Sequence, residues 1–172
     1  MKVIDRFIHP DFIFAVLKEN KELIYDNVWR SNIGWQDEIV SPSGIVLIRS
    51  LSEVQKNILR KSLESNGIII PNAKIELEAQ AYLWHRLSYI PWHNDKEEDD
   101  GVRYAATLYL NEEWKDDWGG LFLYKNNNSI YAESPGFNKL VFNDNNFEHA
   151  TSMLATDAPF RQTVQLFWKI IE

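Results

Sequence analysis

The sequence has 172 residues, of which 45% are apolar and 13% aromatic, a composition that predicts one packed domain over residues 1–172 and argues against a disordered chain. It contains no cysteine, which excludes disulfide frameworks, thiolate catalysis, iron–sulfur clusters and cysteine-based zinc sites, so any metal would need histidine and carboxylate ligands. The formal net charge is −7, and the acidic side chains gather between residues 96 and 117, a field that repels phosphate backbones and disfavours nucleic-acid partners.

The amino-terminal twenty residues lack the basic region and the continuous apolar run of a signal peptide. No stretch of the sequence approaches the length of a membrane span. We therefore expect no membrane association and a cytoplasmic location, which would be the host cell cytoplasm if the protein is viral. No oligomeric state follows from the sequence.

Two helices are predicted in the first 72 residues. The first starts at Pro10-Asp11 and runs to about residue 20. A short apolar strand is expected at 44–49, and Ser52 is a good N-cap for a second helix over 53–65. The apolar residues available for burial are Phe12, Ala15 and Val16 in the first helix and Val54, Ile58 and Leu63 in the second.

After residue 73 the pattern changes to short β runs separated by turn residues. The predicted strands are 74–84, 89–94, 102–110, 120–124, 129–133, 139–143, 147–151 and 161–170. About eight such strands indicate a mainly β fold of the jelly-roll or double-stranded β-helix type, with its core at roughly 73–172. The helices of roughly 1–72 would then pack on the outside of one sheet.

Two of these strands carry or directly precede the candidate metal ligands. His93 and Asp95 lie two residues apart, so both side chains can point to the same face of an extended segment, and His149 follows on a later strand. Two imidazoles and one carboxylate form the facial triad typical of non-haem Fe(II), which leaves open metal positions for chemistry. The other histidines fit less well: we expect a helix-end or exposed role for His9 and a partly buried structural role for His85.

Arg161 and Thr163 share a face of the last strand. A guanidinium matches a carboxylate through two parallel hydrogen bonds, and a hydroxyl two residues on can donate another. The pair is therefore a candidate carboxylate clamp, although an ion pair with one of the many acidic side chains is the alternative. With the triad, the clamp suggests an Fe(II) oxygenase that uses an organic acid as co-substrate.

Short motifs surround these residues in a fixed order: WHND at 92–95, RYAATLYLN at 103–111, WGGLF at 118–122, PGFNKLVF at 135–142, EH at 148–149, RQT at 161–163 and FW at 167–168. The ordered set resembles the Fe(II)/2-oxoglutarate-dependent dioxygenases, and within them the prolyl 4-hydroxylase-like branch. The resemblance covers roughly residues 82–168.

The resemblance implies Fe(II), 2-oxoglutarate and O2 as cofactor and co-substrates, with ascorbate as a candidate reductant. It assigns roles by position: His93, Asp95 and His149 as metal ligands, Arg161 as the catalytic-site partner of the distal carboxylate of 2-oxoglutarate, and Thr163, Tyr109 and Tyr82 as further residues of the co-substrate pocket. Because Asp95 keeps the carboxylate that halogenating relatives lack, hydroxylation of an unactivated C–H is the reaction implied.

The substrate implied first is a prolyl residue of a peptide or protein, as in procollagen-proline 4-dioxygenases. Collagen-type enzymes use Lys at the clamp, whereas this chain has Arg161, so a hydroxylase of a free amino acid or another small metabolite stays open. Nucleic-acid demethylases of the superfamily usually carry a second Arg where this chain has Phe167, so a nucleobase substrate is disfavoured. A non-enzymatic jelly-roll binding module would not need the complete triad, and a cupin-like metal protein without 2-oxoglutarate would leave Arg161 unexplained.

Two further features lie around the candidate site. An acidic run at 96–101 is a candidate lid over the substrate. Aromatic residues that cluster in the sequence would suit a groove for proline-containing peptides. These residues are Trp84, Tyr89, Trp92, Trp118 and Phe122.

Overall fold

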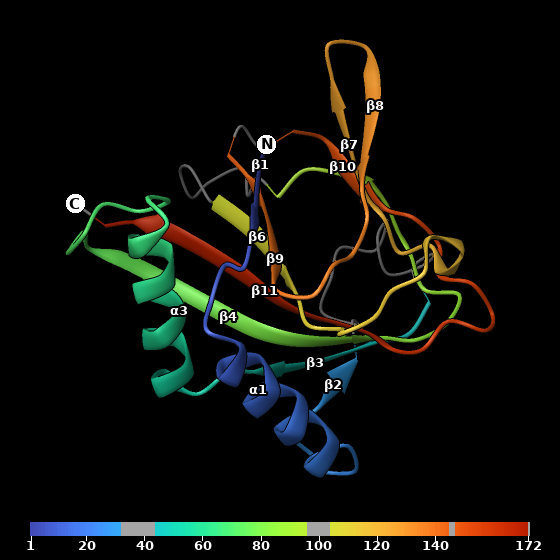
Figure 1. The fold of residues 1–172 in the computed structure, drawn as a ribbon, viewed down its shortest axis with the longest axis horizontal. Helices are drawn as coiled ribbons and strands as arrows, with labels where there is room; N and C mark the ends of the chain where they lie inside the picture. Colours follow the sequence, from blue (N-terminus) through green and yellow to red (C-terminus); the bar gives the residue numbers. More distant parts are fainter. Residues whose placement is uncertain (32–43, 96–103, 145–146, 172) are drawn as a thin grey trace.

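Two antiparallel sheets pack against each other in the computed structural model, which describes residues 1–31, 44–95, 104–144 and 147–171 (Figure 1). In these residues the large sheet has the spatial order β1 (Lys2–Asp5), β9 (Lys139–Asn143), β6 (Tyr104–Tyr109), β11 (Arg161–Ile170), β4 (Ile75–Trp84), β3 (Val46–Ser50) and β2 (Arg30–Ser31). The small sheet has the order β5 (Ile90–His93), β10 (His149–Thr151), β7 (Phe122–Asn126) and β8 (Ser129–Glu133). The mainly β jelly-roll prediction is confirmed.

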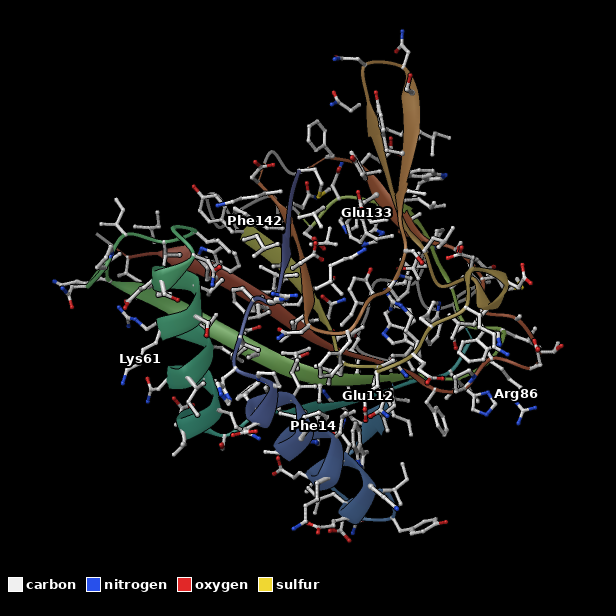
Figure 2. All side chains as sticks on the ribbon, viewed as in Figure 1. Phe14, Lys61, Arg86, Glu112, Glu133 and Phe142 are labelled. Carbon is white, nitrogen blue, oxygen red and sulfur yellow. The ribbon has the colours of Figure 1, made fainter. Side chains whose placement is uncertain are left out.

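The helices α1 (Pro10–Glu22) and α3 (Glu53–Ser65) cover the outer face of the large sheet (Figure 1). The His9 side chain accepts a hydrogen bond from the Asp11 N–H at the start of α1, which is the helix-end role predicted for it. A capping box begins α3, because Ser52 and Gln55 each bond the other's backbone N–H. Lys61 projects from α3 into solvent (Figure 2).

The buried residues predicted for the two helices agree only in part with those in the structure. Leu63 is buried as expected, but its partner on α3 is Leu59, while Val54 and Ile58 are 70% and 41% exposed. In α1, the buried set is Phe12, Ile13, Val16 and Asn20, and Ala15 is exposed. Both helices offer more than one apolar stripe of helical period, and the docking angle on the sheet decides which stripe is buried.

The long strand β11 shows how the large sheet serves two purposes. Val164, Leu166 and Trp168 are at most 2% exposed and join the core beneath the helices. The alternate residues Arg161 and Thr163, both fully buried, point to the other face, toward the small sheet. The pleat of one strand therefore supplies both the core and the interior between the sheets.

All eight strands predicted after residue 73 are present, as β4 to β11, and the strand predicted at 44–49 is β3. The structure also has β1 and β2, which the sequence did not indicate. Both are edge strands of the large sheet, and most of their residues are exposed, so neither carries an alternating apolar pattern. Within the described ranges, no helix is long and apolar enough to cross a bilayer.

Candidate metal and co-substrate site

The structure brings the three predicted metal ligands together at one end of the small sheet. His93 ends β5, His149 begins β10, and the two residues are direct cross-strand partners whose ring centroids lie 4.3 Å apart. Asp95 follows β5 by two residues and lies 3.8 Å from His93 Nε2 and 3.3 Å from His149 Nε2 through its two carboxylate oxygens. One ligand atom from each side chain lies within 4.8 Å of the others, so the group could hold a single cation.

Both imidazoles are oriented by a backbone carbonyl two residues earlier. His93 Nδ1 lies 2.8 Å from the Pro91 carbonyl oxygen, and His149 Nδ1 lies 3.0 Å from the Phe147 carbonyl oxygen. Because a carbonyl only accepts hydrogen bonds, we assign the proton to Nδ1 in each ring. Each Nε2 lone pair is then free to face Asp95, which is the arrangement that metal-binding histidines need.

Asn143 fixes the Phe147 backbone that orients His149. Its Nδ2 donates to the Phe147 carbonyl at 3.0 Å, and its Oδ1 accepts from the Phe147 N–H at 2.9 Å. The side chain is buried, 3.4 Å from His149 Nδ1. Sequence reasoning missed this residue, because the run of Asp and Asn that follows it indicates only a turn.

Burial also affects the protonation state of the His149 imidazole. The side chain is 7% exposed and its ring stacks on Phe122, with centroids 5.1 Å apart and planes at 14°. Desolvation lowers the pKa of His149, and the neighbouring Asp95 carboxylate opposes this shift. The imidazole is therefore neutral at neutral pH, which is the form that binds metals.

The predicted clamp lies in the interior between the sheets. Arg161 is fully buried, and its guanidinium lies between two aromatic rings, 4.8 Å from the Trp84 centroid and 5.0 Å from the Tyr109 centroid. Its Nη2 donates to the Tyr109 hydroxyl at 3.3 Å. Gly120, at φ +66°, lets the side chain pass, because a Cβ there would lie 2.8 Å from Arg161 Cδ.

Arg161 lacks the partners that a buried cation needs. Its Nε and Nη1 have no hydrogen-bond partner, and no ion pair to it is formed in the described part of the chain. Burial lowers the pKa of Arg161, while Tyr109 opposes the shift. Since an isolated buried charge is strongly unfavourable, these donors fit an anionic ligand with a planar pair of oxygens.

The other predicted pocket residues lie around Arg161. Thr163 is the cross-strand partner of both Tyr82 and Tyr109, so the three side chains share the interior face. Thr163 Oγ1 accepts from Trp84 Nε1 at 3.2 Å, and the Tyr82 hydroxyl donates to Gln80 Oε1 at 3.3 Å. Desolvation raises the pKa of Tyr109, so its phenol stays protonated at neutral pH.

A family model described as "2OG-Fe(II) oxygenase superfamily" matches residues 78–168, which is more than half of the chain. The chain belongs to this superfamily. The matched region contains all three candidate metal ligands, Arg161 and the tyrosines beside it. No curated protein sequence gives a significant match.

Solved structures of 2OG-Fe(II) oxygenases share the fold at low sequence identity. A prolyl-4-hydroxylase from Pseudomonas putida has a TM-score of 0.76 at 15% identity, over 99% of this chain and 92% of that one. A Trichoplax adhaerens prolyl hydroxylase, in complex with a hypoxia inducible factor peptide fragment, has a TM-score of 0.72 at 20% identity, over 97% and 82%. HygX from Streptomyces hygroscopicus, with nickel and 2-oxoglutarate bound, has a TM-score of 0.67 at 10% identity, over 98% and 82%.

The residues present fit the groups that 2OG-Fe(II) oxygenases use. Two imidazoles whose Nε2 atoms face one carboxylate are a donor set suited to Fe(II). The two orphaned nitrogens of Arg161, with the Tyr109 and Thr163 hydroxyls beside them, fit one carboxylate of a dicarboxylic acid. Phe122 and Val141 pack with Tyr109, and Phe122 also stacks on His149, so apolar side chains border both the candidate metal ligands and the surroundings of Arg161.

The aromatic residues expected to form one groove are divided among several places. Trp84 and Phe122 are buried in the interior, beside Arg161 and His149. Trp92 precedes His93 in β5 and so faces the opposite side of the small sheet, where its ring lies 4.5 Å from Lys125 Nζ. Trp118 packs against Trp114. The candidate lid at 96–101 lies outside the described residues.

Proposed function

We propose that this chain is an Fe(II)- and 2-oxoglutarate-dependent hydroxylase. His93, Asp95 and His149 would hold the iron, and Arg161 would bind the distal carboxylate of 2-oxoglutarate. The observation that carries the proposal is the fully buried guanidinium of Arg161, with two nitrogens lacking partners, in the same interior as the His–Asp–His group. A metal protein that does not use an organic acid has no need of such a cation.

The chain's own residues would bind and orient the co-substrate. Arg161 supplies two directed N–H donors, and the flanking rings of Trp84 and Tyr109 hold its plane in place. Tyr109 already accepts from Arg161, so its own hydroxyl proton is available to donate to the same carboxylate. Because this end of the pocket is buried, each of these hydrogen bonds acts without competition from water.

The bound iron, with 2-oxoglutarate and O2, would supply the oxidising power to insert one oxygen atom into a C–H bond while 2-oxoglutarate becomes succinate and CO2. The protein residues exclude water, align the co-substrate and keep both imidazoles in the metal-binding tautomer. Ascorbate is our candidate reductant for keeping the metal ferrous, and it is a component to vary in the assay.

The substrate that we propose is a prolyl residue in a peptide or protein. The motifs of the chain resemble prolyl 4-hydroxylases, and two of the similar structures are prolyl hydroxylases, one of them in complex with a peptide. The alternative is a free amino acid or another small metabolite, since HygX, which shares the fold, has been solved with hygromycin B bound.

Anaerobic titration with Fe(II) and 2-oxoglutarate tests the class of enzyme. We expect the metal-to-ligand charge-transfer band of a chelated 2-oxo acid with the parent protein, and its loss in His93→Ala and Asp95→Ala. His85→Ala is the matched control, because that ring packs on Phe160 outside the site. A band that persists in both ligand variants would contradict the assignment.

The substrate is tested by mass spectrometry after aerobic turnover with Fe(II), 2-oxoglutarate and ascorbate. We expect a gain of one oxygen on prolyl peptides, and none when 2-oxoglutarate is omitted. Oxidation of free proline without oxidation of prolyl peptides would favour the small-metabolite alternative.

A further inference from the structure

A row of rings crosses the small sheet from the candidate metal site to its far edge. His93, His149, Tyr124 and Tyr131 are successive cross-strand partners on β5, β10, β7 and β8. Directly opposed residues point to the same face of a sheet, so both tyrosines share the face of the metal ligands. We call Tyr124 and Tyr131 the tyrosine shelf.

The two rings of the tyrosine shelf stack on each other, with centroids 5.3 Å apart and planes at 18°. Phe147 flanks Tyr124 at 6.1 Å. Tyr131 is 46% exposed, and it lies on the β7–β8 hairpin, which projects from the rest of the molecule (Figure 1). Tyr124 is half-buried and packs on the cluster of Tyr109, Phe122 and Val141, so it supports Tyr131 from below. A rigid aromatic pair with one open ring, in line with the candidate metal site, fits a ligand contact.

The distance between the candidate metal site and Tyr131 fits an extended peptide ligand. Two steps between neighbouring strands separate His149 from Tyr131, which is about 10 Å at ~4.8 Å per step. A polyproline II helix rises ~3.1 Å per residue and repeats every three residues, so a residue and its third neighbour point the same way about 9 Å apart. A free amino acid at the metal cannot reach Tyr131.

The charged groups beside the tyrosine shelf form an ion pair. Glu133 is the residue of β8 two positions after Tyr131, on the same face, at the foot of the hairpin (Figure 2). Its carboxylate lies 3.9 Å from Lys139 Nζ, and the side chain is only 28% exposed. Because the two charges offset each other, an uncharged segment suits this surface, and aromatic-lined grooves are the usual receptors for proline-rich segments.

We propose that Tyr124 and Tyr131 form a subsite for a proline ring that lies three residues from the hydroxylated residue of a peptide substrate in the polyproline II conformation. This inference rests on the proposed function, because that function places the reacting carbon beside the metal. It goes further in naming the second contact and its position along the peptide.

The test uses nine-residue peptides with a central proline and a second proline placed two or three residues before or after it. The proteins are the parent, Tyr131→Ala, Tyr131→Phe and the control Ile130→Ala, whose side chain is exposed on the opposite face of β8. For peptides with the three-residue spacing, on one side of the centre, we expect Tyr131→Ala to raise KM about three- to tenfold without changing kcat. Tyr131→Phe should restore the parent KM, and Ile130→Ala should not change it.

An equal change in KM for both spacings, or no change in Tyr131→Ala, would overturn the tyrosine shelf while leaving the hydroxylase proposal intact. If no prolyl peptide is hydroxylated, the proposed substrate class fails, and calorimetric titration of the same peptides into the parent and Tyr131→Ala decides the subsite by itself. Weaker binding by Tyr131→Ala, confined to the three-residue spacing, would support it, and equal or absent binding would reject it.

Discussion

Arg161 lies in an environment that is unfavourable for a cation when no ligand is bound. It is a fully buried cation with two unpartnered nitrogens. Removal of an uncompensated buried charge should stabilise the fold, as replacement of buried charged groups by apolar residues often does. We therefore expect Arg161→Met to raise the free energy of unfolding, without metal or co-substrate, by at least about 1 kcal/mol. Urea denaturation, monitored by tryptophan fluorescence, measures this change in the free energy of unfolding.

The same variant should lose the response to 2-oxoglutarate. The parent, with metal, is expected to melt at a higher temperature as 2-oxoglutarate is added, since a ligand that binds only the folded state stabilises it. Arg161→Met should show no such shift. A less stable variant that still responds to 2-oxoglutarate would mean that the guanidinium has a structural role.

Asn143 is a candidate positioning residue, which would act on the candidate metal site through Phe147 and His149. Its amide bonds both the N–H and the carbonyl of Phe147, and that carbonyl orients His149. We expect Asn143→Ala to weaken Co(II) binding by about tenfold or more, the usual effect of losing a residue that orients a ligand. Absorption titration measures the affinity, and Asn57→Ala, on the exposed side of α3, is the control. A loss of stability with unchanged Co(II) affinity would limit Asn143 to the fold.

At the scale of a single element, the two faces of β11 serve different properties: one face contributes to the stability of the core, and the other faces the candidate co-substrate site. Leu166 faces the core under the helices, whereas Thr163 faces the candidate pocket. Leu166→Ala should lower the free energy of unfolding by about 2–5 kcal/mol and leave the affinity for 2-oxoglutarate nearly unchanged. Thr163→Val should cost only about 1 kcal/mol of stability but weaken 2-oxoglutarate binding roughly tenfold.

Urea unfolding and the charge-transfer titration measure the two properties separately. If Leu166→Ala weakens 2-oxoglutarate binding as much as Thr163→Val does, the two faces of β11 are coupled and the separation fails.

The elements also show what the sequence can predict. Strands with strict alternation, such as β11, were found because one face is apolar and the period of two is unambiguous. That His93 and Asp95 share a face could be predicted from local spacing, because residues two apart in an extended segment point the same way, and the structure brings both beside His149. The buried stripe of α3, the division of the aromatic residues and the role of Asn143 were missed. Each of these depends on contacts between distant segments, which no local pattern contains.

The tyrosine shelf was missed for the same reason. Tyr124 and Tyr131 are seven positions apart in the sequence, and only the pairing of β7 with β8 stacks them. Their connection to His149 depends on a second pairing, between β7 and β10. A register shift of one residue would turn both rings away from the metal ligands.

At the scale of the whole molecule, the candidate metal site closes one end of the small sheet. Its ligands come from β5, from the segment after β5 and from β10. Arg161 lies on β11 of the large sheet, so a co-substrate that contacts both Arg161 and the bound metal would connect the two sheets. Metal and 2-oxoglutarate should therefore stabilise the whole fold by linkage.

This linkage has a calculable size. A metal present at one hundred times its dissociation constant adds about 2.7 kcal/mol to the free energy of unfolding. For a domain of this length that corresponds to a rise in melting temperature of about 5–10 °C. We expect Co(II) to produce this rise in the parent, 2-oxoglutarate to increase it further, and His93→Ala to show neither effect. A Co(II) shift in His93→Ala equal to that of the parent would place the stabilising ion at another site, because the imidazole of His93 supplies one of the three converging donors.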